Sequence, residues 1–162
     1  MILRVRFALR RTAALHLEYG PLRQRLVEQG VTAPTAVDVS QAICAIRREK
    51  LPDPEVLGNA GSFFKNPMVS VELAQRLNAE HADLVAYPQA DGRVKLAAGW
   101  LIERAGWKGF REGDAGVHRL QALVLVNYGQ ATGQQLLALA QRIQADIFQR
   151  FAVELEIEPI VL

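Results

Sequence analysis

The hydrophobic period of the sequence changes near residue 152, and this change constrains the fold more than any other feature. Thr132 and Gln135 have the spacing of a helix-capping box. The apolar residues that follow share one face of a helix: Leu136, Ala140, Ile143, Ile147 and Phe151. From residue 153 to residue 158 apolar and acidic residues alternate, which predicts a strand. A chain that combines such helices and strands belongs to the α+β class.

The first fifty residues carry both kinds of pattern. In residues 2–9 apolar side chains alternate with Arg4 and Arg6, which predicts a half-buried strand. Residues 15–19 alternate again, so we expect a hairpin. Two helices should follow, one between Pro21 and Gly30 and one from Thr35 or Asp38 to about Lys50.

The middle of the chain begins with a glycine-rich stretch. Residues 57–67 are expected to form tight turns, because Gly58 and Gly61 allow backbone conformations with positive φ. Beyond this stretch the patterns predict helices at about 70–80 and 94–105, the second closed by Gly106, and a short buried strand at Ala122–Val126.

Composition excludes several classes of protein. With 162 residues, half of them hydrophobic, the chain can bury a core, which excludes disorder. No apolar run approaches the ~18 residues of a membrane span, so no membrane partner is expected. Cys44 is the only cysteine, and the histidines lack metal-ligand spacing. We therefore expect no internal disulfide, no metal and a cytoplasmic location.

Charge is distributed unevenly along the chain. Residues 1–50 hold nine Lys/Arg and four Asp/Glu, a difference of +5, whereas residues 51–162 hold ten and thirteen, a difference of −3. Such a basic segment can bind a polyanion. No run of five like charges and no nucleic-acid recognition motif occurs, so solvated arginines are the favoured interpretation and no nucleic-acid partner is expected.

The glycine-rich stretch is the strongest candidate for a chemical site. It lacks the Gly-Lys-Ser/Thr of a phosphate-binding loop and the Gly-x-Ser-x-Gly of a nucleophile elbow. A turn at Gly58–Gly61 can aim the Ser62 hydroxyl at a ligand, although a structural turn remains the alternative. Other candidates have structural alternatives too: Arg47 and Lys50 as helix-end cations, Tyr19 and Gln121 as strand residues, and the glutamates of 153–158 as a solvated face.

Several longer segments resemble one protein family. They are Leu51-Pro52-Asp53-Pro54, residues 58–67 (GNAGSFFKNP), 87–92 (YPQADG), 95–102 (KLAAGWLI), 117–127 (VHRLQALVLVN) and 153–158. In this order they are similar to the C-terminal half of UDP-N-acetylenolpyruvoylglucosamine reductase, and the segment around Tyr19 resembles its tyrosine loop. The resemblance extends over essentially the whole chain.

The resemblance implies a division into three parts. Residues 1–34 would be a strand hairpin and tyrosine loop left from an FAD-binding domain, 35–152 a substrate-binding domain with a small sheet and packed helices, and 153–162 a return strand. The flavin-binding half would precede Met1, so this part alone is expected to bind neither FAD nor NADPH and to be inactive. A stand-alone nucleotide-sugar binding module without redox activity is the alternative.

The resemblance also implies an activity and a set of residues. In that family NADPH reduces FAD, and the enolpyruvyl group of the UDP-sugar is reduced to give UDP-N-acetylmuramate for peptidoglycan. Ser62 would be the proton donor and Glu158 the catalytic carboxyl. Substrate contacts would come from Tyr19, Arg47, Lys50, Asn66, Tyr87 and Gln121. The partners would be the UDP-sugar and the flavin domain, with no obligate protein partner. The tail after Glu158 departs from the family pattern, which leaves Glu156 as the other candidate.

Overall fold

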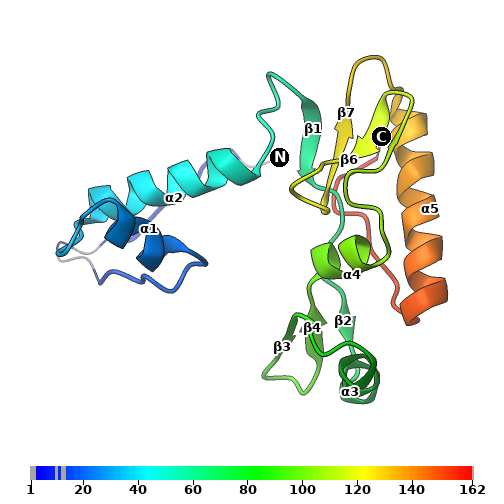
Figure 1. The fold of residues 1–162 in the computed structure, drawn as a ribbon, viewed down its shortest axis with the longest axis horizontal. Coiled ribbons are helices and arrows are strands. Elements are labelled where there is room, and N and C mark those ends of the chain that lie inside the picture. Colours follow the sequence, from blue (N-terminus) through cyan, green and yellow to red (C-terminus); the bar gives the residue numbers. More distant parts are fainter. Residues whose placement is uncertain (1–2, 10, 12–13, 162) are drawn as a thin grey trace. The chain divides into compact units, whose positions relative to one another are not determined.

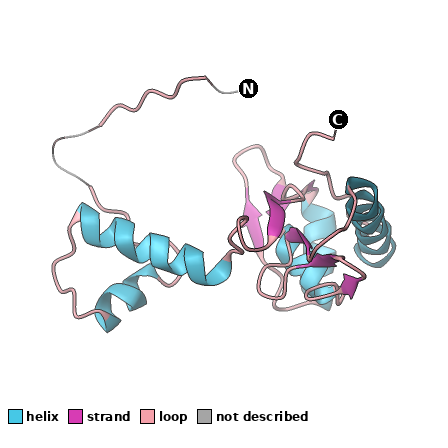
Figure 2. Ribbon diagram, turned by 90° about the horizontal axis from the view of Figure 1, so that it is seen from above, coloured by secondary structure: helices cyan, strands magenta, loops and turns pink. Residues whose placement is uncertain are grey.

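The computed structural model describes residues 3–9, 11 and 14–161, and the chain divides into two compact units (Figures 1 and 2). The first unit, Met1–Lys50, contains α1 (Leu22–Glu28) and α2 (Ala36–Lys50). The second, Leu51–Leu162, contains three helices and two small antiparallel sheets. This architecture confirms the predicted α+β class.

In the first unit the two predicted helices are present. Leu22 and Leu26 of α1 pack against Ala42 and Ile46 of α2 and form a small buried cluster. The start of α2 is fixed by Thr35 and Asp38, which exchange hydrogen bonds: the Thr35 amide donates to the Asp38 carboxylate over 2.8 Å, and the Asp38 amide donates to the Thr35 hydroxyl over 3.3 Å.

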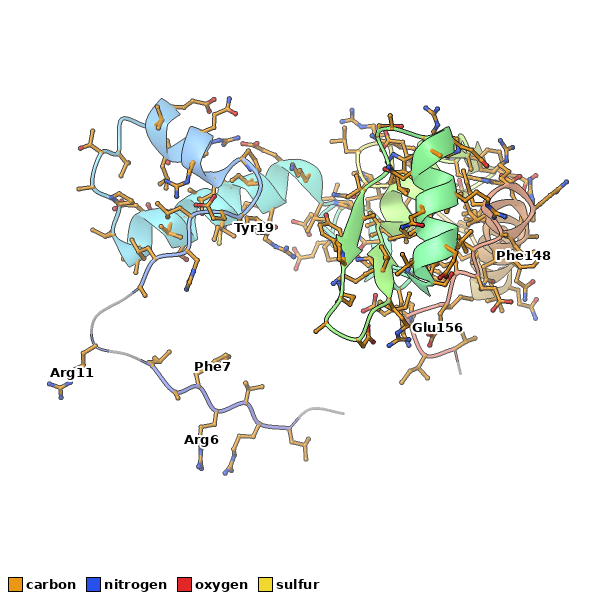
Figure 3. All side chains as sticks on the ribbon, turned by 90° about the horizontal axis from the view of Figure 1, so that it is seen from below. Arg6, Phe7, Arg11, Tyr19, Phe148 and Glu156 are labelled. Carbon is orange, nitrogen blue, oxygen red and sulfur yellow. The ribbon has the colours of Figure 1, made fainter. Side chains whose placement is uncertain are left out.

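The strand and hairpin predicted for the N-terminal residues are wrong in the part of the chain that the structure describes. Residues 3–9 are extended but form no strand, and Leu3 and Phe7 are 82% and 76% exposed. Figure 3 shows Phe7 and Arg6 projecting to opposite sides of this segment, as the alternation predicts. A strand also needs a partner backbone for its hydrogen bonds, and no described residue pairs with this segment. Residues 2, 10, 12 and 13 of the predicted hairpin lie outside the described residues.

The second unit is built on two sheets. The larger has the order β1 (Gly58–Ser62), β7 (Val124–Asn127), β6 (Ala115–Val117), β5 (Arg111–Glu112). The smaller has the order β2 (Met68–Val69), β4 (Val94–Leu96), β3 (Ala86–Pro88). Helix α5 (Gly133–Phe151) lies along β6, β7 and α4 (Ala98–Arg104), and α3 (Val71–Glu80) contacts β4 (Figure 1).

Helix α5 confirms the capping prediction. The Thr132 hydroxyl accepts a hydrogen bond from the Gln135 amide over 3.2 Å, and the Gln135 side chain accepts one from the Thr132 amide over 2.8 Å. The buried face of the helix consists of Leu139, Ala140, Ile143, Ile147 and Phe151. Because α5 covers the larger sheet, this face closes the main core.

Two other predictions need correction. The segment 94–105 is not one helix: Val94 and Leu96 are buried while Lys95 between them is half-buried, and this two-residue period places them in β4, between β2 and β3. Only Ala98–Arg104 is helical, and it is followed by Gly106 at φ +87°. The glycine-rich stretch contains a strand, β1, as well as turns. The strand predicted at Ala122–Val126 is present, but begins at Val124.

The C-terminal alternation is confirmed as a burial pattern. Val153 and Leu155 are buried, and the glutamates between and after them are exposed. The segment does not form a regular strand: it makes one bridge, Phe64 to Ile157. Hydrogen bonds from the Lys65 amide to the Glu156 carbonyl (2.9 Å) and from the Glu158 amide to the Phe63 carbonyl (3.0 Å) attach it to residues 63–65. We call residues 152–158 the return segment.

The compact units divide between Lys50 and Leu51, and the predicted domain boundaries after residues 34 and 152 remain predictions. The division follows from the packing of α2 on α1, which keeps residues 36–50 in the first unit. The return segment packs into the core of the second unit through Val153 and Leu155. Assignment of residues 1–34 to a flavin domain remains a prediction. Over the residues that the structure describes, no helix is long and apolar enough to cross a membrane.

Candidate functional site

Ser62 is held at the end of β1 by the side chain of Asn59. The Asn59 amide group donates to the Leu57 carbonyl over 2.8 Å, and its oxygen accepts from the Gly61 amide over 3.0 Å. Gly61 has φ +74°, a conformation that favours glycine, and the pairing of β1 with β7 is irregular between Asn59 and Ser62. The Ser62 side chain is exposed and donates to no described residue.

A row of side chains crosses the larger sheet from Ser62. Ser62 pairs with Val124, and the His118 amide donates to the Val124 carbonyl over 2.8 Å on the other side. Residues opposite one another in neighbouring strands share a face of the sheet, so Ser62, Val124 and His118 lie on the same face. His118 is 8% exposed, and its Nδ1 has no partner among the described residues. Burial, together with the charge of Arg119, lowers the pKa of His118.

Glu158 meets the same end of β1 from the return segment. Its amide donates to the carbonyl of Phe63, the residue after Ser62. The carboxylates of Glu158 and Glu156 differ in what they contact. Lys65 forms an ion pair with Glu156, whereas Glu158 is exposed and has no ion pair among the described residues. This difference supports Glu158 over Glu156 as the carboxyl available to a ligand.

Gln121 completes this group from the turn before β7. Its carbonyl accepts a hydrogen bond from the Val124 amide over 3.0 Å, and the Phe63 amide donates to the Leu123 carbonyl over 2.7 Å. The side chain of Gln121 is half-buried. The fold therefore gathers Ser62, Gln121 and Glu158, which are far apart in the sequence, at one end of the β1–β7 pair.

Asn66 and Tyr87 belong to a second group on the smaller sheet. Met68, Lys95 and Tyr87 are opposite one another on β2, β4 and β3, so they share a face. The Lys95 ammonium lies 5.8 Å from the centroid of the Tyr87 ring. The Asn66 side-chain oxygen accepts a hydrogen bond from the Ala98 amide over 2.9 Å, so Asn66 caps the start of α4.

Two features of this second group were missed from the sequence. Lys95 is a cation beside Tyr87, and the alternation Val94-Lys95-Leu96 would have indicated that it points away from the core. The capping role of Asn66 depends on a residue 32 positions away, and no local signal indicates it. A hollow of about 970 Å³ opens next to Asn66, between Met68–Val69 and the return segment, but neither Ser62 nor Glu158 lines it.

The other three predicted site residues belong to the first unit. Tyr19 is 47% exposed, and its carbonyl accepts a hydrogen bond from the Leu22 amide over 3.0 Å at the start of α1. Arg47 and Lys50 are exposed in the last turn of α2, where cations favour the negative end of the helix dipole. Glu49 between them is held by Arg25 over 2.6 Å. Their contact with a substrate remains a prediction.

The chain contains an α+β domain in which the backbones of Ser62, Gln121 and Glu158 come together at one end of β1 and β7. No group of three potential metal-ligating side chains occurs in the described ranges. Residues 53–162 match the C-terminal domain of UDP-N-acetylenolpyruvoylglucosamine reductase. The chain therefore belongs to the UDP-N-acetylenolpyruvoylglucosamine reductase family, and the resemblance seen in the sequence is confirmed.

Proteins named UDP-N-acetylenolpyruvoylglucosamine reductase match this chain at different levels of sequence identity. The reductase of Pseudomonas fluorescens (strain Pf0-1) is 75% identical over 98% of this chain, and that of Chromobacterium violaceum is 57% identical over the whole chain. The chain spans about half the length of these relatives, 47% and 48% respectively. A crystal structure of the enzyme from Thermus caldophilus is 28% identical and covers 75% of this chain and 33% of its own, with a TM-score of 0.45.

Proposed function

We propose that this chain is the substrate-binding part of a cytoplasmic flavoenzyme that reduces UDP-N-acetylenolpyruvoylglucosamine to UDP-N-acetylmuramate with NADPH. The observation that carries the proposal is the hydrogen bond that ties the backbone of Glu158 to Phe63, the residue after Ser62, in a chain of this family. The flavin-binding part of the enzyme is the partner that the reaction requires. Family membership does not favour the alternative of a binding module without redox activity.

Ser62 is proposed as the proton donor. Addition of a hydride to the enolpyruvyl double bond leaves negative charge on the carbon next to the carboxylate, and that carbon must receive a proton. A hydroxyl suits this step when it is exposed and not already donating to the protein. Ser62 has both properties, and the bulged end of β1 fixes its position.

Glu158 is proposed to stabilise the developing negative charge. When it carries a proton, the carboxyl can donate a hydrogen bond to the enolate. Glu156 is the less favoured candidate because its carboxylate forms an ion pair with Lys65. The carboxamide of Gln121 is a further donor at the same end of the sheet.

The remaining predicted residues are proposed to bind the anionic and sugar parts of the substrate. Arg47 and Lys50 supply cations for a diphosphate, and Tyr19, Asn66 and Tyr87 supply polar and aromatic contacts. Lys95, adjacent to Tyr87, adds a cation to that group.

FAD, reduced by NADPH, supplies the hydride when it is bound, and most of its ligands are expected in the other part of the enzyme. Within this chain, the exposed turn at Gly61 leaves the surface next to Ser62 open to the flavin-binding part of the enzyme.

The test uses a longer protein that contains this chain and a flavin-binding part. Ser62→Ala should leave flavin reduction by NADPH unchanged and slow product formation by ~100-fold or more, because only the proton transfer needs the hydroxyl. Ser40→Ala, at an exposed position of α2, is the matched control and should match the parent. Turnover of Ser62→Ala near the parent rate would show that the turn is structural.

A second pair of variants tests the glutamate assignment. Glu158→Gln should lower turnover, whereas Glu156→Gln should leave turnover close to that of the parent. The reverse result would assign the catalytic role to Glu156. If the parent protein binds the UDP-sugar but oxidises no NADPH with it, the binding-module alternative is correct.

A further inference from the structure

An apolar groove lies between the start of α5 and the three residues that follow Glu158. Its volume is about 480 Å³. Its apolar lining consists of Phe63, Leu136, Leu137, Pro159, Ile160 and Val161. None of the described residues that line it is charged. We call it the α5 groove.

The α5 groove is a surface that the core does not use. Leu136 packs against the main core, whereas Leu137 is half-buried and belongs to neither hydrophobic cluster of the described residues. Ile160 and Val161 are 88% and 59% exposed. Apolar side chains gathered in this way on a surface are typical of a place where another polypeptide covers them.

The groove adjoins the candidate site. Phe63 follows Ser62, Pro159 follows Glu158, and the hydrogen bond from the Glu158 amide to the Phe63 carbonyl (3.0 Å) joins the two segments. In the proposed reaction the hydride donor and the substrate carbon that accepts the hydride must come within about 3–3.5 Å of one another. Since Ser62 is the proposed proton donor to the neighbouring carbon, the polypeptide that holds the flavin has to reach this end of the larger sheet.

The family comparison supplies the occupant. Residues 53–162 match a C-terminal domain, and the chain spans 47% and 48% of the relatives from P. fluorescens and C. violaceum. Domains of one chain contact one another through interfaces with apolar centres, for which an uncharged groove is suited. We propose that the α5 groove is the docking surface for the flavin-binding part of the enzyme, which places apolar side chains between Leu137 and Ile160. This assignment rests on the proposed function.

The first test measures the burial of the groove. A water-soluble paramagnetic probe broadens the NMR signals of exposed methyl groups, so in this chain it should broaden those of Ile160 and Leu137. In a longer protein that contains this chain and a flavin-binding part, the broadening of both signals should be much weaker. Ile143, on the buried face of α5, is the control and should stay protected in both proteins. Equal broadening of Ile160 in the two proteins would overturn the proposal.

The second test uses variants of the groove. Leu137→Ser and Ile160→Ser should each lower the temperature at which the longer protein releases its flavin by about 2–4 °C, because a covered apolar side chain is lost. In this chain alone, Ile160→Ser should shift the melting temperature by no more than about 1 °C. Phe148→Ser removes a 54% exposed ring that lies eleven residues, about 16 Å, further along α5, and should leave flavin release unchanged. If Leu137→Ser and Ile160→Ser also leave it unchanged, the proposal is wrong.

These measurements do not depend on turnover, so they separate this proposal from the proposed function. Protection of Ile160 in a longer protein whose Ser62→Ala variant turns over at the parent rate would support the docking surface and reject the role of Ser62. Slow turnover of Ser62→Ala without protection of Ile160 would do the reverse. The other possible occupant is a second copy of this chain. Dimerisation of the chain in sedimentation experiments that Ile160→Ser abolishes would assign the groove to that contact and contradict the proposal.

Discussion

The first unit contains a cluster of four buried apolar residues between α1 and α2, whereas the main cluster of the second unit has twenty-one among the described residues. The first unit also exposes the apolar side chains of residues 3–9. Both units carry equally clear local patterns in their sequence. Helices and strands formed where their apolar residues pack into a core. Residues 3–9, which alternate but have no partner strand among the described residues, did not form a strand.

The candidate site follows the same division. Ser62, Gln121 and Glu158 are brought together by backbone hydrogen bonds within the larger core. Tyr19, Arg47 and Lys50 are exposed residues of the smaller unit. The candidate residues of the second unit are therefore attached to the larger core, whereas those of the first unit lie on the surface of the smaller one.

The largest expected effect is that of Phe64→Ala. Phe64 is 1% exposed in the main core and bridges to Ile157, so its truncation should lower the free energy of unfolding of the second unit by about 3–5 kcal/mol. Denaturant titration followed by tryptophan fluorescence measures this, because both tryptophans are in the second unit. A loss below about 1 kcal/mol would contradict the assignment of Phe64 to the core.

Ile46→Ala tests whether the first unit is stabilised independently. Ile46 is 2% exposed between α1 and α2, and its truncation should cost about 2 kcal/mol or more. Hydrogen exchange should accelerate throughout α1 and α2 and remain unchanged in β6 and β7. Faster exchange in β7 would show that the two units unfold together.

A smaller effect is expected from the titration of His118. Burial and the charge of Arg119 lower the pKa of His118 below its ordinary value of about 6.5, so the folded state resists a proton that the unfolded chain accepts. The contribution of neutral His118 to stability should be complete above pH 7 and should be lost as the pH falls below about 6.5. His118→Gln should flatten this dependence in urea titrations, whereas His16→Gln, at an exposed position, should leave it unchanged.

The smallest effect is predicted for Phe7→Ser. Phe7 is 76% exposed, so its loss should change the melting temperature of this chain by no more than about 1 °C. A marked loss of stability would show that Phe7 packs against other residues. The N-terminal segment would then be part of a core, and the first unit would no longer differ from the second in this respect.

Much of the fold was predictable because its signals are local. The Thr132–Gln135 capping box, the apolar face of α5 and the prolines and glycines that bound α1 and α2 act within one or two helical turns. The prediction of one helix over 94–105 was wrong because the alternation of Val94, Lys95 and Leu96 is too short to be recognised beside a helical pattern. Only pairing with β2 and β3 makes them a strand.

The sequence by itself determined the α+β class, the approximate bounds of α1, α2, α3 and α5, and, through its resemblance to a family, the residues to consider for the site. The tertiary structure decided which of those residues meet. Periodicity placed Glu154, Glu156 and Glu158 on one face without distinguishing them. The fold distinguishes Glu156 from Glu158 because the return segment pairs with residues 63–65, which places Lys65 opposite Glu156 and Phe63 opposite Glu158. Such pairings join residues about ninety positions apart, so no local sequence pattern encodes them. They stabilise the chain only after the core between α5 and the larger sheet has formed.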